Sequence, residues 1–108
     1  MNIEEIRDFC LSLENVEESS PFGPTTLVFK TNNKLFLLIG LDNLDTRFNV
    51  KCNPDKAIEL RDQYPNSVLP GYHMNKKHWN TIVVNGDLKR KQLEEFIMDS
   101  YKLVKGKK

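Results

Sequence analysis

Residues 25–41 read TTLVFKTNNKLFLLIGL, and this stretch decides the fold. Residues 25–30 are mostly β-branched, aromatic or leucine residues, which favours a strand. Asn32 and Asn33 follow, and asparagine tolerates the positive φ angles of a tight hairpin turn. Residues 34–41 are apolar at successive positions, which predicts a return strand covered on both faces. The stretch therefore predicts an antiparallel hairpin.

Further strand signals lie C-terminal to the hairpin. In residues 47–52, apolar residues alternate with Arg47, Asn49 and Lys51, so we expect these three side chains on the solvent-exposed face of a third strand. Residues 67–69 predict a brief strand, and residues 81–84 predict a longer one. Together with the hairpin these segments predict an antiparallel sheet.

Three helices are expected, one at each end of the chain and one in the middle. Residues 3–13 have helical apolar spacing, with Asn2 as N-cap and Glu5 in the reciprocal capping position. Asn53-Pro54 begins the middle helix, which ends at Pro65. Residues 88–104 carry the apolar stripe of a long last helix, for which Asp87 is the expected cap. The predicted fold class is α+β.

Composition indicates a single domain over residues 1–108. The chain is 39% hydrophobic and 29% charged, which is typical of globular proteins, and no apolar run is long enough to cross a bilayer. Because the N-terminus lacks the features of a secretory signal, we expect a cytoplasmic protein without a membrane partner. Cys10 and Cys52 are expected to be buried free thiols. No pattern predicts a cofactor, and no heptad stripe specifies an assembly, so we expect a monomer.

Charge is distributed unevenly along the chain although the formal net charge is only +1. Residues 1–20 hold one arginine and six carboxylates, for a net charge of −5. Residues 70–108 hold nine basic and four acidic residues, for a net charge of +5. The C-terminal third is therefore the part that could contact a polyanion.

Residues 70–79 contain both histidines of the chain, its single tryptophan and the pair Lys76-Lys77. This mixture of stacking faces, hydrogen-bonding groups and positive charge suits a contact surface. His73 and His78 are five residues apart in an irregular segment, a spacing that does not favour a shared metal ion. We therefore predict no metal site. No serine or cysteine lies in a known nucleophile motif, so we also predict that the protein is not an enzyme.

The fold explains several of the conspicuous residues without any ligand. Phe22, in the turn Pro21-Phe22-Gly23-Pro24, is expected to anchor that turn in the core. The alternative is that the turn lies near a rim and lines a pocket. Trp79 is expected to bury its ring, and Gly71 to be required by the backbone conformation.

Basic and imidazole side chains are the candidate contacts to nucleic acid. Lysine and arginine would meet phosphates, and histidine would donate hydrogen bonds to sugar or base. The candidates are His73, Lys76, Lys77, His78, Arg47, Lys51, Lys89, Arg90 and Lys91. The alternative is that these charges form only a solvated surface. In that case the aromatic and histidine-rich segment would recognise a protein partner or a small ligand, with no nucleic-acid role.

The order of motifs along the chain resembles the MmcQ/YjbR-like family. The matching segments are Pro21-Phe22-Gly23-Pro24, Lys34-Leu35-Phe36, Lys51-Cys52-Asn53-Pro54, the run from Pro70 to Asn80, and Ser100-Tyr101. This resemblance implies an α+β domain with the double-wing arrangement of a phage transcription factor's DNA-binding domain, and family members are described as predicted DNA-binding proteins. The resemblance brings no catalytic residues with it. The small size of the basic patch predicts that any binding of DNA is modest and salt-sensitive.

Overall fold

The predicted hairpin forms the core of the sheet. A computed structural model describes residues 1–71 and 74–106, and in it β2 (Thr26–Thr31) pairs antiparallel with β3 (Lys34–Gly40). Asn32 and Asn33 make the turn with φ angles of 54° and 63°. Both residues adopt the left-handed conformation that asparagine tolerates, so the predicted hairpin is confirmed.

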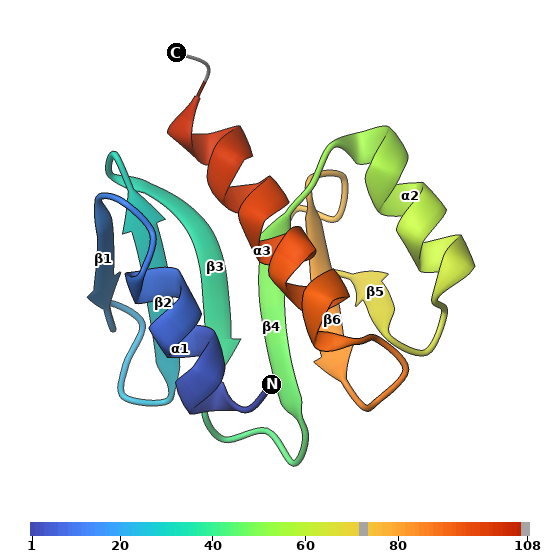
Figure 1. Cartoon of the computed structure of the whole chain (residues 1–108), viewed down its shortest axis with the longest axis horizontal. Helices are drawn as coiled ribbons and strands as arrows, with labels where there is room; N and C mark the ends of the chain where they lie inside the picture. Colours follow the sequence, from blue (N-terminus) through green and yellow to red (C-terminus); the bar gives the residue numbers. More distant parts are fainter. Residues whose placement is uncertain (72–73, 107–108) are drawn as a thin grey trace.

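Six antiparallel strands make up the sheet, in the order β1-β2-β3-β4-β6-β5 (Figure 1). The remaining strands are β1 (Val16–Ser19), β4 (Thr46–Lys51), β5 (Val68–Pro70) and β6 (Trp79–Val84). The short strands β1 and β5 form its two edges. β1 was not expected from the sequence, and β6 begins two residues earlier than expected.

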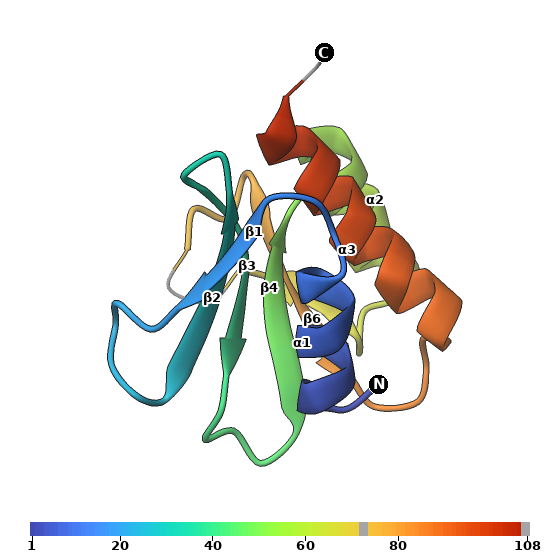
Figure 2. The same ribbon diagram turned by 60° about the vertical axis from the view of Figure 1, so that its left-hand side comes forward.

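In the described part of the chain, three helices cover one face of this sheet: α1 (Ile3–Leu11), α2 (Pro54–Gln63) and α3 (Arg90–Lys105). Figures 1 and 2 together show all three on the same side of the strands. The predicted α+β class is thus confirmed. None of the described helices is long and apolar enough to span a membrane.

The helix caps agree with the sequence at two of three positions. Asn2 and Glu5 form a capping box, and the side chain of Asn53 accepts from the first turn of α2. The prediction for α3 was wrong, because the N-cap is Lys89 rather than Asp87. Gln92 accepts from the Lys89 backbone N–H at 2.9 Å, while Asp87 lies with Ser67, whose hydroxyl is 3.2 Å from a carboxylate oxygen of Asp87.

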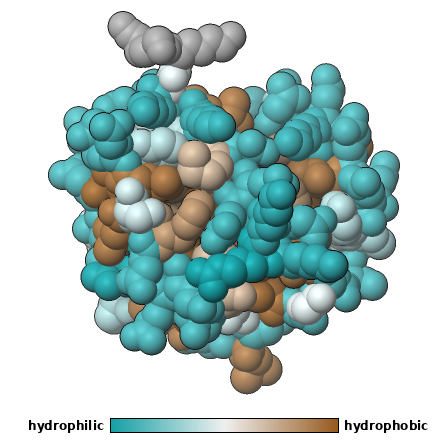
Figure 3. Space-filling model, viewed as in Figure 1, coloured by the Kyte–Doolittle hydropathy of each residue, from teal (hydrophilic) through white to brown (hydrophobic). Residues whose placement is uncertain are grey.

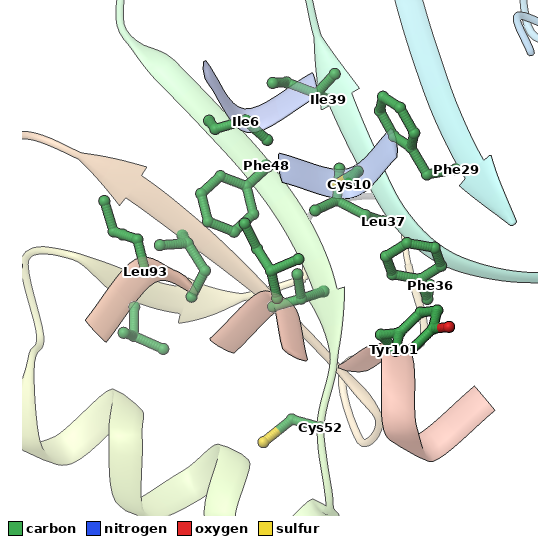
Figure 4. Close-up of a cluster of buried hydrophobic side chains, with 14 of the residues drawn as sticks. Ile6, Cys10, Phe29, Phe36, Leu37, Ile39, Phe48, Cys52, Leu93 and Tyr101 are labelled. Atoms are coloured by element: carbon green, nitrogen blue, oxygen red, sulfur yellow. The ribbon is translucent and has the colours of Figure 1, made fainter. Parts of the chain in front are cut away.

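The main core lies between the sheet and the helices (Figure 4). Ile6 and Cys10 of α1 meet Phe48 of β4, and Leu93 of α3 lies against the same layer; all four are at most 1% exposed. The rings of Phe36 and Tyr101 meet edge to face, with centroids 5.4 Å apart. Burial of this apolar surface is the main force that holds the helices on the sheet.

β3 and β4 diverge at one end, where α3 crosses them (Figure 1). Their pairing stops at Leu37 and Val50. Beyond that point the buried hydroxyl of Ser100 donates to the Phe36 carbonyl oxygen at 2.5 Å and accepts from the Lys51 N–H at 2.8 Å. A side chain of α3 therefore replaces the missing link between the two strands.

Candidate functional site

The sheet face opposite the helices carries a second, smaller apolar cluster. Val28, Leu38 and Trp79 are buried there, with the partly buried Leu35 and Met74 packed against them. Figure 2 shows the β1–β2 loop (residues 20–25) and the described part of the β5–β6 loop (residues 71 and 74–78) projecting on this side. We call it the open face. Trp79 buries its ring as predicted, with 8% exposure.

A hollow of about 570 Å³ lies on the open face. Its walls come from three central strands, β6 and three loops, so residues far apart in the sequence meet there. The lining residues are Phe22, Thr26, Leu38, Gly40, Asn43, Arg47, Asn49, Met74 and Thr81. This volume lies in the range of small-molecule clefts.

Polar side chains from β4 and β6 stand in the middle of the hollow. Asn49 and Thr81 are register partners, and the Thr81 hydroxyl donates to the Asn49 carboxamide oxygen. The Nδ2 group of Asn49 donates to no residue in the described part of the chain. A hydrogen-bond donor therefore faces an otherwise mixed polar and apolar cleft.

Arg47 lines the hollow two residues before Asn49. Its Nε and Nη2 atoms donate to the two oxygens of Asp45, at 2.7 Å and 3.3 Å. This hydrogen bonding lowers the pKa of Asp45 and raises the pKa of Arg47, so the pair is ionised at neutral pH. The guanidinium is held in place and retains its Nη1 group for a ligand.

The described part of the β5–β6 loop is held by Arg61 of α2. The Arg61 Nη2 atom donates to the carbonyl oxygens of Lys76 and, at 3.3 Å, Trp79, while Nε donates to Asn80 Oδ1 at 2.8 Å. Gly71 lies so close to Trp79 that an added Cβ would be 2.8 Å from the Trp79 Cβ. Its φ is not positive, so the expected reason was wrong: close approach, rather than backbone conformation, excludes a side chain at this position.

Some of the predicted nucleic-acid contacts lie together at one end of the open face. Lys51 is the register partner of Trp79, and the next residue, Cys52, donates its N–H to the carbonyl of His78 at 2.7 Å. Lys76 and Lys77 are exposed in the adjoining loop. Within the described residues, none of these three lysines forms an ion pair. His73 lies outside the described residues.

The remaining predicted contacts lie elsewhere. Lys89 is the N-cap of α3, and Arg90 and Lys91 are its first residues. This helix covers the other face of the sheet and follows the opposite end of β6. Arg90 is occupied by two carboxylates, Glu5 at 3.1 Å and Glu94 at 3.2 Å. The structure thus separates this basic group from the lysines near Trp79.

The helix side of the molecule is mostly hydrophilic, with smaller apolar areas between polar residues (Figure 3). A groove of about 440 Å³ lies there, lined by parts of α2 and α3, and includes Cys52 and Leu103. Lys56 and Asp99 pair across its wall at 2.8 Å. Two of the groove's charged groups therefore neutralise each other, and the Lys102 side chain also lines the groove.

Both thiols are buried, as predicted. Burial raises the pKa of Cys10 to about 12, and it also raises the pKa of Cys52. Among the residues that the structure describes, no three His, Cys, Asp or Glu side chains are grouped so as to hold a metal ion.

Sequence reasoning missed the hollow itself. The alternation in β4 correctly placed Arg47, Asn49 and Lys51 on one face, but nothing in the sequence marked Thr81 or Met74 as their neighbours. Phe22 was expected in the core, and this was wrong because its side chain is 68% exposed at the hollow's rim.

Comparisons with known proteins place this geometry in a family. The family model YjbR matches residues 11–103. The chain belongs to the YjbR family. It is similar to the uncharacterized protein YbdF of Escherichia coli O157:H7, with 38% identity over 94% of this chain and 82% of the relative. It is also similar to the uncharacterized protein YjbR of Escherichia coli strain K12, with 28% identity over 94% of this chain and 85% of that protein.

Solved structures share the fold of this YjbR-family chain. The crystal structure of Deinococcus radiodurans protein DR2400, described with the domain DUF419, has a TM-score of 0.93 and 34% identity, covering 98% of this chain and 80% of that one. A crystal structure from Pseudomonas syringae has a TM-score of 0.80 and 27% identity, covering 96% and 99%. The similarities establish the family and the α+β fold.

Proposed function

We propose that this protein binds DNA weakly through the open face of its sheet. The observation that carries the proposal is the position of Lys51, Lys76 and Lys77 at one end of that face, unpaired with any described carboxylate and adjoining the hollow. Arg47 extends the positive charge along β4. Ammonium and guanidinium groups spaced along one surface are suited to a phosphate backbone. The family resemblance implies the double-wing arrangement of a phage transcription factor's DNA-binding domain, and that relationship would also support binding of DNA.

The small number of cations sets the expected affinity. Three or four phosphate contacts to a single strand would give a slope of log K against log salt of about −2 to −3. The net charge of +1 adds little long-range attraction. We therefore expect binding that is measurable at low salt and weak at physiological salt.

We also propose that the protein acts by binding rather than by catalysis. Its two thiols are held in their neutral form by burial, so neither is an activated nucleophile. A cytoplasmic location would suit DNA binding and stays a prediction from the sequence.

The test is a titration of labelled single-stranded and duplex DNA, followed by fluorescence anisotropy at 25 mM and 150 mM salt. Lys76→Glu/Lys77→Glu is the test variant. Lys89→Glu/Lys91→Glu is the matched control, because it makes the same change in charge at exposed lysines beyond the opposite end of β6. We expect the first variant to lose binding and the second to retain most of it.

Two results would count against the proposal. Equal loss in both variants would mean that the contact depends on total charge and not on the open face. No binding of either DNA below high micromolar concentration by the wild-type protein would remove DNA as a ligand.

A second candidate function is recognition of a small ligand without any nucleic acid. The specific observation in its favour is the hollow, whose size and mixed polar and apolar lining suit a small molecule. Binding of a free mononucleotide with no binding of DNA would support this alternative.

A further inference from the structure

We propose that the hollow on the open face receives one unstacked nucleobase. The base could belong to a DNA strand or to a free nucleotide, since the recognised chemistry is the same. The strand-borne source rests on the proposed DNA binding, whereas recognition of the base itself does not.

The dimensions of the hollow suit this ligand. Its volume of about 570 Å³ exceeds that of a base with its sugar, and it opens on the side of the sheet that bears none of the described helices. A base paired and stacked in a duplex could not enter it, because both of its faces are covered by neighbours. Single strands should therefore bind more tightly than duplexes.

Apolar side chains supply surfaces for the flat faces of a base. Leu38 and Met74 lie in the wall, and Phe22 stands at the rim with most of its side chain exposed. Exposed aromatic rings of this kind stack on bases of any sequence.

Amide groups supply the partners for a base edge. The Nδ2 group of Asn49 donates to no described residue, although its carboxamide oxygen is already fixed by Thr81. Asn43 adds a second carboxamide from the β3–β4 loop (residues 41–45), held over Gly40, where an added Cβ would be 2.6 Å from Asn43 Nδ2. The edge of a base presents hydrogen-bond donors and acceptors side by side. A carboxamide, with one carbonyl oxygen and one NH₂ group, can bond to both.

Cations around the hollow are placed for the phosphate. Arg47 is in the wall, and its Nη1 group is not used by Asp45. Met74 of the wall belongs to the same loop as Lys76 and Lys77. A purely apolar ligand would desolvate the Nη1 group of Arg47 and the Nδ2 group of Asn49 without offering either an acceptor, so a ligand that combines a polar heterocycle with a phosphate fits better.

Trp79 provides a built-in probe, because it is the only tryptophan and packs with Leu38 and Met74. The experiment follows its emission during titration with three ligands: the four deoxynucleoside monophosphates, a 12-residue single strand, and the same strand with abasic sites throughout. The abasic strand keeps the phosphates and removes the bases. The variants are Asn49→Leu and Phe22→Ala, with Lys89→Glu/Lys91→Glu as control.

We expect the intact strand to bind about tenfold more tightly than the abasic strand. Phe22→Ala and Asn49→Leu should abolish that difference and leave the abasic affinity unchanged. Because Phe22 is exposed, its variant tests the proposal even if Asn49→Leu disturbs the fold, which thermal melting would reveal.

The remaining outcomes separate this proposal from DNA binding. Equal affinity for the two strands, with loss in Lys76→Glu/Lys77→Glu, would overturn base recognition and leave DNA binding intact. Saturable quenching by monophosphates without binding of either strand would support base recognition and remove DNA. No response to any of the ligands would overturn both.

Discussion

The hydroxyl of Ser100 donates to the carbonyl oxygen of Phe36 in the space where β3 separates from β4. The same hydroxyl accepts from the Lys51 N–H, so one side chain satisfies a buried C=O and a partly buried N–H. This contact fixes the end of β4 from which Lys51 projects. It therefore connects the stability of the core to the position of a proposed phosphate contact.

Ser100→Ala should destabilise the protein by about 2–4 kcal/mol, because it removes the Ser100 hydroxyl from the buried C=O of Phe36 and the partly buried N–H of Lys51. Denaturant unfolding measures the change. Ser12→Ala is the control, since the Ser12 hydroxyl donates to Phe9 at an exposed position and should matter little. Similar small losses in both variants would show that Ser100 is not the bridge.

Gly71→Ala should displace the β5–β6 loop from β6. The new methyl group would lie 2.8 Å from the Trp79 Cβ and 2.9 Å from its carbonyl oxygen, so one of the two segments must move. We expect a loss of stability of about 1–3 kcal/mol and a shift in Trp79 emission. Gly86→Ala is the control, because its positive φ costs stability but nothing lies within 4 Å of the added Cβ. An unchanged emission spectrum in Gly71→Ala would contradict the close contact.

Arg61→Met should loosen the β5–β6 loop more than it alters the rest of the fold. Asn80 Nδ2 already has no partner in the described part of the chain, and losing Arg61 would leave the buried Oδ1 unpaired as well. We expect a cost of about 2–4 kcal/mol and faster hydrogen exchange at residues 74–79. Arg7→Met, which removes an exposed pair with Glu18, serves as the comparison. Uniform acceleration across the sheet in Arg61→Met would argue for global destabilisation instead.

Asp45→Asn should strengthen DNA binding by about threefold, because it releases Arg47 to meet a phosphate. Asp42→Asn makes the same change in charge in the same loop, where Asp42 forms no ion pair with a described residue. Anisotropy titrations compare the two. Equal gains would mean that only net charge matters and that Arg47 is not a contact.

Thiol labelling should distinguish Cys52 from Cys10. At pH 8 both should react slowly in the folded protein, since burial raises both pKa values and favours the neutral thiols. Raising the pH to 10 should accelerate Cys52, which lines a groove, before Cys10, whose pKa is about 12. Mass spectrometry after labelling identifies the site, and unfolded protein gives the unprotected rate. Faster reaction at Cys10 would contradict the burial that the structure shows.

Local signals made much of the fold predictable. The Asn32-Asn33 turn, the Asn2 capping box and the start of α2 at Pro54 depend on neighbouring residues only, and all three are present. β1 escaped detection because VEES is short, polar and at a sheet edge, so neither burial nor alternation marks it. β1 is a strand because it pairs with β2, and this pairing depends on the tertiary structure rather than on the local sequence.

The candidate site was harder to predict, because its parts are adjacent only through the sheet. Asn49 and Thr81 are 32 residues apart and meet through the register of β4 with β6. Phe22 was misplaced because an aromatic residue in a turn is normally buried, whereas this turn projects from the open face. Lys89 to Lys91 looked equivalent to Lys76 and Lys77 in sequence, and only the topology separates them.

The two edge strands also bear on how this protein avoids aggregation. β1 exposes its free edge beside Glu17 and Glu18, and β5 has three residues and ends at Pro70, which has no N–H to donate. A strand from another molecule would meet carboxylates at the β1 edge and only a short row of backbone hydrogen-bonding groups at the β5 edge. The short edge strands, of which β1 was not predictable from the sequence, thus make the sheet a poor template for the addition of further strands.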